Sequence, residues 1–241
     1  AYNGLSLELQ IRTQRQHAWA TAVETMGTFL GQALKAGQGD QPWREFFQRA
    51  SAALAMEIAR AYQKLGNDAK YNQWREKVLA QDPDNVEILI DMMKRHMQAQ
   101  NTPQALKYAR QTLKALPAAK KPDSLDASAW KSMTDAGYAT AYAIIGADAY
   151  QKQSYATAIT NFTNSVKYYK RNDSAYYHMA LCYWQQNKLE PAMLNFAKAY
   201  VLKGSVAASA KKYLDQLAGQ GRRDPRAFVQ RVIERAQQDL K

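Results

Sequence analysis

Apolar residues recur at helical spacing along almost the whole chain, and no stretch alternates as a strand does. Near the N-terminus an apolar stripe predicts a helix over about residues 6–36, ended by the glycine-rich segment 37–40. Pro42 predicts the start of a second helix, because a helix has no use for an N–H at its first position. This helix keeps its apolar stripe up to Leu65, and Gly66 suits a left-handed cap at its end.

Two segments in the C-terminal half match each other at a distance of 34 residues. Around Ala158 the chain reads YAIIGADAYQKQSYATAITNFTNSVKYYK, and around Ala192 it reads YYHMALCYWQQNKLEPAMLNFAKAYVLK. Small residues match small residues and aromatic residues match aromatic ones, which indicates a repeated structural unit. The matched pairs are Tyr142 and Tyr176, Ile145 and Met179, Gly146 and Ala180, Tyr155 and Leu189, and Phe162 and Phe196.

This period, carried by small and aromatic residues, resembles the tetratricopeptide repeat. The resemblance implies an all-α fold in which antiparallel helix pairs stack into a right-handed superhelical solenoid. The first unit is the weakest match, because Tyr71 occupies the small position and Arg75 the aromatic one. The four units with this resemblance span about residues 52–84, 86–118, 139–171 and 173–204.

The units divide the chain into three expected regions. Residues 1–51 are expected to form N-terminal helices that pack on the array. Residues 52–204 form the array, with an insertion at about residues 118–136. Residues 205–241 are expected to form C-terminal capping helices, which shield the apolar end of the array.

Two helices outside the regular units carry their own expectations. Ser124 or Asp126 is expected to cap a long helix that runs from about Ala127 into the third unit. The last helix, over about residues 226–241, has an apolar face that must be covered. The body of the array is the expected cover, and the alternative is a partner protein.

In the repeat family the first helix of each unit lines a concave groove, so the resemblance implies a site for a protein or peptide there. The first two units offer mixed charge, and the last two offer apolar and aromatic surface. An alternative stays open, in which helices of the chain itself cover the aromatic part. The expected groove residues are Arg60, Lys64, Asp91, Lys94, Met97, Tyr150, Tyr177, His178, Leu181 and Trp184, and the third unit adds Ala143, Ile144, Ala147 and Gln151.

One subtype of the family clamps a C-terminal carboxylate with lysine and asparagine side chains. The positions of that asparagine hold Arg60, Lys94, Ala147 and Leu181 here. The clamp pattern is therefore absent, and a receptor of that kind is not expected.

The net charge of +12 favours acidic partners and leaves a nucleic acid or another anionic surface as an alternative to a protein. The basic residues are spread along the chain and form no single block. Aromatic residues fall mostly on packing positions of the repeat, which weakens the case for stacking on bases. A peptide or protein is thus the leading expectation.

No pattern of catalytic chemistry emerges from the sequence. His17, His96 and His178 have no metal-ligand spacing, and no phosphate-binding loop or nucleophile elbow occurs. Cys182 has no cysteine partner and lies in an apolar stretch, which indicates a buried thiol. The expectation is a non-enzymatic protein with no cofactor and no metal.

No apolar run approaches the length of about 20 residues that a membrane helix needs. The chain begins with Ala1, so we expect either a cytoplasmic protein or an exported one whose targeting segment precedes this residue. The second possibility leaves open a role as an accessory component of an exported or membrane-associated complex.

Overall fold

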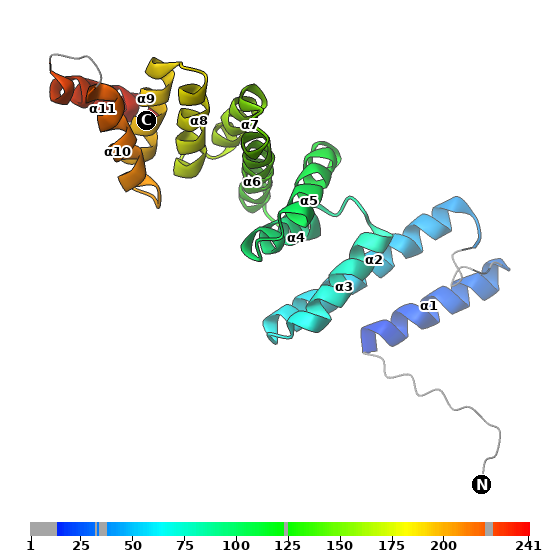
Figure 1. Ribbon diagram of the computed structural model, residues 1–241. Helices are drawn as coiled ribbons and strands as arrows, with labels where there is room; N and C mark the ends of the chain where they lie inside the picture. Colours follow the sequence, from blue (N-terminus) through cyan, green and yellow to red (C-terminus); the bar gives the residue numbers. More distant parts are fainter. Residues whose placement is uncertain (1–13, 32, 34–37, 123–124, 220–223) are drawn as a thin grey trace, which may run out of the picture. The chain divides into compact units, whose positions relative to one another are not determined.

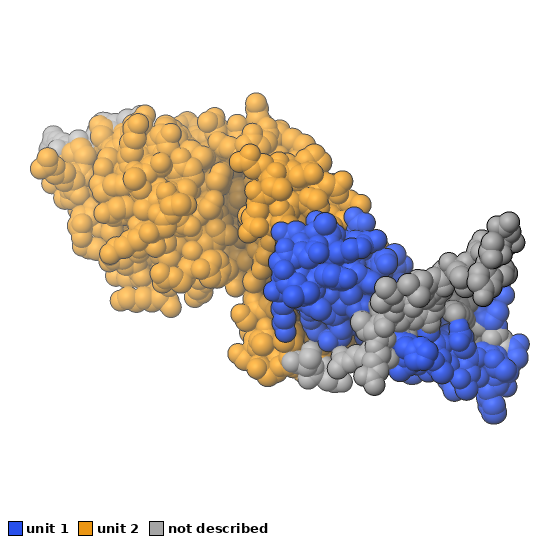
Figure 2. Space-filling model, turned by 90° about the horizontal axis from the view of Figure 1, so that it is seen from below, with its two compact units in different colours: residues 1–88 blue, residues 89–241 orange. Residues whose placement is uncertain are grey.

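The computed structural model describes residues 14–31, 33, 38–122, 125–219 and 224–241. Every regular element in these ranges is a helix, and no strand occurs among them (Figure 1). The chain divides into two compact units, residues 1–88 and residues 89–241, which are coloured separately in Figure 2. The all-α expectation, with its repeated helix pairs, is confirmed.

The described part of the first unit begins with a helix that is shorter than expected. This helix, α1, ends at Leu30, because Gly31 adopts a left-handed φ of 62°. The expected end near residue 36 is therefore wrong, and the expected start at residue 6 lies outside the described residues. The helices of this unit are α1 (Gln14–Leu30), α2 (Gln41–Lys64), α3 (Asp68–Gln81) and the beginning of α4 (Val86–Gln98).

The second unit continues α4 and adds further helices, each packed against a neighbour along the chain. The expected long helix is confirmed as α6, which has 25 residues. Asp126 caps it by accepting a hydrogen bond from the backbone N–H of Ala129 at 2.7 Å. The elements are α5 (Thr102–Ala115), η2 (Leu116–Ala118), α6 (Ala127–Gln151), α7 (Tyr155–Tyr168), α8 (Asp173–Gln185), α9 (Leu189–Val201), α10 (Ala207–Gly219) and α11 (Pro225–Leu240).

From α2 to α9, the turn inside each of the four successive helix pairs carries a residue with left-handed backbone geometry. Gly66 between α2 and α3 has a φ of 67°, and Gln100 between α4 and α5 has a φ of 56°. Gln153 and Asn187 occupy the same place before α7 and α9, with φ of 58° and 56°. These residues stand 34, 53 and 34 positions apart, which is the spacing of the repeat with its one insertion. The backbone therefore repeats even where the side chains differ.

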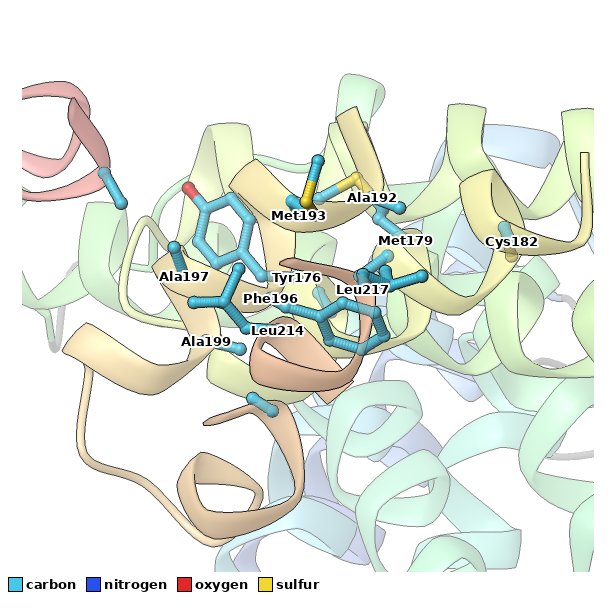
Figure 3. Packing of buried hydrophobic residues seen from close by; sticks show 14 of the residues in the cluster. Tyr176, Met179, Cys182, Ala192, Met193, Phe196, Ala197, Ala199, Leu214 and Leu217 are labelled. Carbon is cyan, nitrogen blue, oxygen red and sulfur yellow. The ribbon is translucent and has the colours of Figure 1, made fainter. Parts of the chain in front are cut away.

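Small and aromatic residues interlock where the helices cross, as the repeat predicts. A Cβ added to Gly146 on α6 would lie 3.0 Å from the ring of Phe162 on α7, so glycine fits this close approach without moving the ring. In the next unit Ala192 and Phe196 are fully buried on α9. Figure 3 shows their cluster, which also contains Leu214 of α10. This packing confirms the matched positions of the two segments.

The weak match in the first repeat unit, residues 52–84, has a structural explanation. Tyr71 and Arg75 of α3 are both buried, with exposed fractions of 4% and 3%. The guanidinium of Arg75 lies over the ring of Tyr71, 4.4 Å from its centroid, and donates a hydrogen bond to Asn72. A cation–π pair therefore replaces the usual small and aromatic residues in this helix.

The last helix packs on the body of the second unit. Val229, Ile233 and Ala236 of α11 are buried in the same cluster as Phe196. An ion pair of 2.7 Å joins Lys198 of α9 to Asp239 of α11. The expectation that the chain itself covers the apolar face of this helix is confirmed.

Candidate binding cleft

A cleft of about 1060 Å³ runs along the long helix α6 in the second unit. One wall comes from α4 and α5, and the other comes from α7 and α8. The cleft extends from Ser128 near the start of α6 to Gln151 at its end. At a rise of about 1.5 Å per residue this distance is roughly 35 Å, which is long enough for a peptide of several residues.

The floor of the cleft consists of alanine side chains on one face of α6. Ala136, Ala139, Ala143 and Ala147 lie three or four residues apart and therefore point the same way. Short side chains at these positions leave the space that forms the cleft. A longer side chain at Ala143, which is half-buried and lines the cleft, would extend into this space.

Carboxylates of the cleft are paired with lysines on the same helix. Asp135 forms an ion pair with Lys131, and Asp148 forms one of 2.9 Å with Lys152. Both pairs have the i,i+4 spacing that brings side chains together on a helix surface. The floor is therefore close to neutral, with an apolar centre and charges near its ends.

A stack of tyrosines supports the wall that α7 forms. The ring of Tyr168 lies 4.4 Å from that of Tyr138 at an angle of 13°, and 6.2 Å from that of Tyr142 at 14°. Burial raises the pKa of Tyr138, and the two neighbouring tyrosines add to this effect. The stack fixes the end of α7, where Tyr168 and Tyr169 line the cleft.

His178 of α8 lines the cleft as expected, but its ring is held by packing. Its Nδ1 lies 2.8 Å from the carbonyl oxygen of Ser174, so this nitrogen donates a hydrogen bond. The ring stacks on Phe162 at 5.5 Å and meets Tyr150 and Tyr177 edge-on. Within the described part of the chain, no group of three or more His, Cys, Asp or Glu residues is placed to hold a metal ion.

Several other expected groove residues also line this cleft. Met97 of α4 contributes to the wall opposite His178. The third-unit residues Ala143, Ile144, Ala147 and Gln151 all line it.

The aromatic residues expected further along the groove lie elsewhere. Tyr177 and Trp184 contact the ring of Tyr213 on α10, at centroid distances of 6.3 and 5.4 Å. Tyr150 packs beside Tyr155, and Leu181 is half-buried against the core. None of these four is among the residues that line the cleft. The penultimate helix α10 thus covers part of the aromatic surface, so the expected alternative that helices of the chain itself cover it applies here.

The expected residues of mixed charge do not line the cleft either. In the first unit Arg60 forms ion pairs with Glu87 at 2.7 Å and Glu57 at 3.3 Å, and the hydrogen bonds that it donates to Glu87 raise its pKa most. Lys64 is exposed at the end of α2. In the second repeat unit, residues 86–118, Asp91 forms an ion pair with Arg95 at 3.3 Å, and Lys94 is exposed.

The repeat pattern does not predict the cleft residues at the turn after α7. Tyr168, Tyr169 and Asn172 line the cleft, although the repeat pattern directs attention to the first helix of each unit. Tyr169 is 53% exposed, which is unusual for an aromatic residue in this chain. The adjacent aromatic and basic residues of the sequence KYYKR were the available signal.

Two further observations bear on chemistry and setting. Cys182 is fully buried, and burial raises the pKa of its thiol to about 11, so the thiol stays protonated at neutral pH. Across the described residues, no helix combines the length and apolar character that a membrane span requires.

Comparisons with known proteins show the fold. No protein-family model and no curated protein matches the chain. The solved structure titled "Crystal structure of MamA" aligns with a TM-score of 0.50 and 19% identity over 76% of this chain and 95% of that chain. The "MamA RS-1 ArsTM double mutant" aligns with a TM-score of 0.50 and 16% identity over 78% and 96%.

A looser alignment, with a TM-score of 0.36 and 16% identity, relates 93% of this chain to 86% of a tetratricopeptide repeat protein from Parabacteroides merdae ATCC 43184. The repeated helix pairs and the 34-residue spacing of their turns, with one insertion, give this chain a tetratricopeptide-like fold.

Proposed function

We propose that this protein is a non-catalytic scaffold that binds a peptide or protein segment in the cleft along α6. The observation that carries the proposal is the alanine floor of the cleft, from Ala136 to Ala147. Mostly apolar concave sites with a few polar groups are the usual form of binding pockets. An array of helix pairs supplies such a surface without any catalytic group.

The dimensions of the cleft favour a chain-like ligand. Its length of roughly 35 Å along α6 greatly exceeds that of a small metabolite. Apolar surface at its centre offers burial to side chains of a partner, and Met97 adds an adaptable side chain to one wall. Polar groups at the ends, such as Ser128 and Gln151, are available to backbone amides of the ligand.

Photo-crosslinking from the cleft tests this function. A benzophenone amino acid replaces Ala143 in the cleft, or Ala129, which is exposed on the same helix and does not line the cleft. In extracts of the source organism, position 143 is expected to give a discrete protein adduct that position 129 does not give. Ala143→Phe, which fills the cleft, is expected to abolish capture of the same protein, whereas Ala129→Phe preserves it.

Two results would contradict the proposal. One is the same set of adducts from both positions, which would mean that the cleft has no special role. The other is full capture by the Ala143→Phe variant with its fold intact by circular dichroism. Either result would move the binding surface away from α6.

A nucleic acid is the second candidate ligand, because the charge of the chain is unevenly distributed. Residues 1–88 carry ten Lys and Arg and ten Asp and Glu, whereas residues 89–241 carry 23 and 11. The whole excess of positive charge therefore belongs to the second unit. Binding of a single-stranded oligonucleotide that falls steeply with salt would support this candidate, and salt-independent binding would oppose it.

A further inference from the structure

The turn between α7 and α8 combines positive charge with an exposed aromatic ring. It follows Lys167 at the end of α7 and contains Tyr169, Lys170 and Arg171. All three cations are exposed, and none forms an ion pair with a residue that the structure describes. The turn is thus a concentrated source of uncompensated positive charge in a unit that is already basic.

This basic turn lies directly at the rim of the cleft. Lys170 and Arg171 stand between Tyr169 and Asn172, and both of these neighbours line the cleft. Consecutive Cα atoms are about 3.8 Å apart, so each cation is anchored beside a lining residue. A charge bound at this rim lies within one screening length, about 8 Å at physiological salt, of the two cations.

Acidic groups near the turn do not neutralise it. Asp135 and Asp148 of the cleft are already paired with lysines on α6. Asp173, the nearest acidic residue in the sequence, accepts a hydrogen bond from the backbone N–H of Val206 at 3.4 Å. Its carboxylate keeps its charge but forms no ion pair with a cation among the described residues, and three cations outnumber it at the turn.

The turn is also held in place by its surroundings. Tyr168 is clamped by the stack with Tyr138 and Tyr142. Asn172 accepts a hydrogen bond from the N–H of Ala175 and donates one to Ser165 at 3.0 Å. A turn fixed at both ends loses little backbone entropy on binding, so the cost of ordering falls on the side chains of its cations.

We propose that the cleft takes an acidic segment of a partner protein, whose carboxylates lie over Lys170 and Arg171. An apolar side chain of the same segment lies against Tyr169 and the alanine floor. This inference rests on the proposed function of the cleft and adds the chemical class of its ligand. The alanine floor favours a polypeptide over a nucleic acid, because it offers apolar burial to side chains. Single strands stack successive bases on several aromatic rings, whereas Tyr169 is the one exposed ring at the rim of the cleft among the described residues.

Fluorescence anisotropy of a labelled synthetic peptide tests the proposal with the whole chain. The probe contains glutamate, leucine and phenylalanine, and two matched probes carry glutamine or lysine in place of every glutamate. The acidic probe is expected to bind at least about tenfold more tightly than the glutamine probe, and the lysine probe more weakly still.

Matched variants locate the effect at the turn. Lys170→Gln with Arg171→Gln is expected to weaken binding of the acidic probe about tenfold. The control, Arg226→Gln with Arg231→Gln on α11, removes the same charge from exposed sites that do not line the cleft. This control is expected to change binding by less than about twofold, because its charges act only through the general field.

Each outcome decides a separate question. Three results would overturn the proposal that the ligand is acidic. They are equal affinity of the three probes, no binding of the acidic probe at low salt, and an equal loss of affinity in both double variants. Loss of oligonucleotide binding in the turn variant, with no peptide binding, would assign the turn to nucleic acid instead. A different result would contradict the proposed function of the cleft: the Ala143→Phe variant would bind the acidic probe with unchanged affinity.

Discussion

The two units of this protein share one backbone design but differ in how they fill it. Both place a left-handed residue in the turn of a helix pair, at Gly66 in the first unit and at Gln153 in the second. In the second unit, alanine and phenylalanine interlock where the helices cross. In the first unit, Tyr71 and Arg75 occupy the corresponding positions.

The units also differ in charge and in exposed apolar surface. The first unit is neutral overall, and the second holds the entire positive excess. Phe29, Phe46 and Leu65 of the first unit are more than half exposed. The second unit contains the cleft and the large core cluster. The difference teaches that regular packing, positive charge and the candidate site occur together in one part of the chain.

The largest expected effect tests the core of the second unit. Phe196→Ala removes a fully buried ring and is expected to lower the free energy of unfolding by about 3–5 kcal/mol. Hydrogen exchange of α8 to α10 is expected to accelerate accordingly. The matched control is Phe46→Ala at a ring that is 58% exposed, where the expected cost is below about 1 kcal/mol. A similar decrease in the free energy of unfolding in both variants would contradict the difference in packing between the two units.

The thiol of the second unit reports on the same packing. Native Cys182 is expected to react with a disulfide reagent at pH 8 more than about 100-fold slower than in the unfolded chain. Its pKa of about 11 lies above the ordinary value, so the neutral thiol is favoured in the folded state. This stabilisation is complete below the ordinary pKa of about 8.5 and is lost as pH rises toward 11.

An exposed thiol in the first unit supplies the reference for this measurement. Ala53→Cys, combined with Cys182→Ser, places a single cysteine at an exposed position of α2. It is expected to react at the rate of the unfolded chain. A fast reaction of native Cys182 would show that α8 opens readily, against the packing described for the second unit.

A third prediction concerns the close crossing of α6 and α7. Gly146→Val is expected to cost about 1–3 kcal/mol, because even its Cβ would lie 3.0 Å from the ring of Phe162. Gly219→Val at the end of α10 is the control, since nothing lies within 4 Å of a Cβ there. Thermal unfolding measures both. A tolerated Gly146→Val would mean that the helices separate at little cost.

The smallest effects compare the two turns directly. Gly66→Gln is expected to lower stability by about 1 kcal/mol, because a side chain strains the left-handed backbone. Gln153→Gly is expected to raise it by about 0.5–1 kcal/mol, since glycine relieves that strain at some entropic cost. Chemical denaturation measures both changes. The two changes must have opposite signs, and a control, Gln230→Gly inside α11, is expected to destabilise.

Part of the candidate site was accessible from the repeat pattern. Met97, Ala143, Ala147 and His178 were expected in a groove, and they line the cleft. These residues lie on one side of their helices because a repeat assigns each position of a first helix to one face. It placed Trp184 on the same face, but α10 packs against this ring through Tyr213. The contact depends on how a helix about 30 residues later returns to the array.

The sequence by itself determined the helix pairs, their period and their interlocking residues. These features depend on neighbours within one or two helices, and local spacing encodes such neighbours. Only the tertiary structure decided where the cleft lies and which residues form its rim. Tyr169, Lys170 and Arg171 lie in a turn whose position depends on the stack of Tyr168 with α6. The closest ring of this stack, Tyr138, lies outside the repeat units, so the repeat pattern does not predict it and packing alone revealed it.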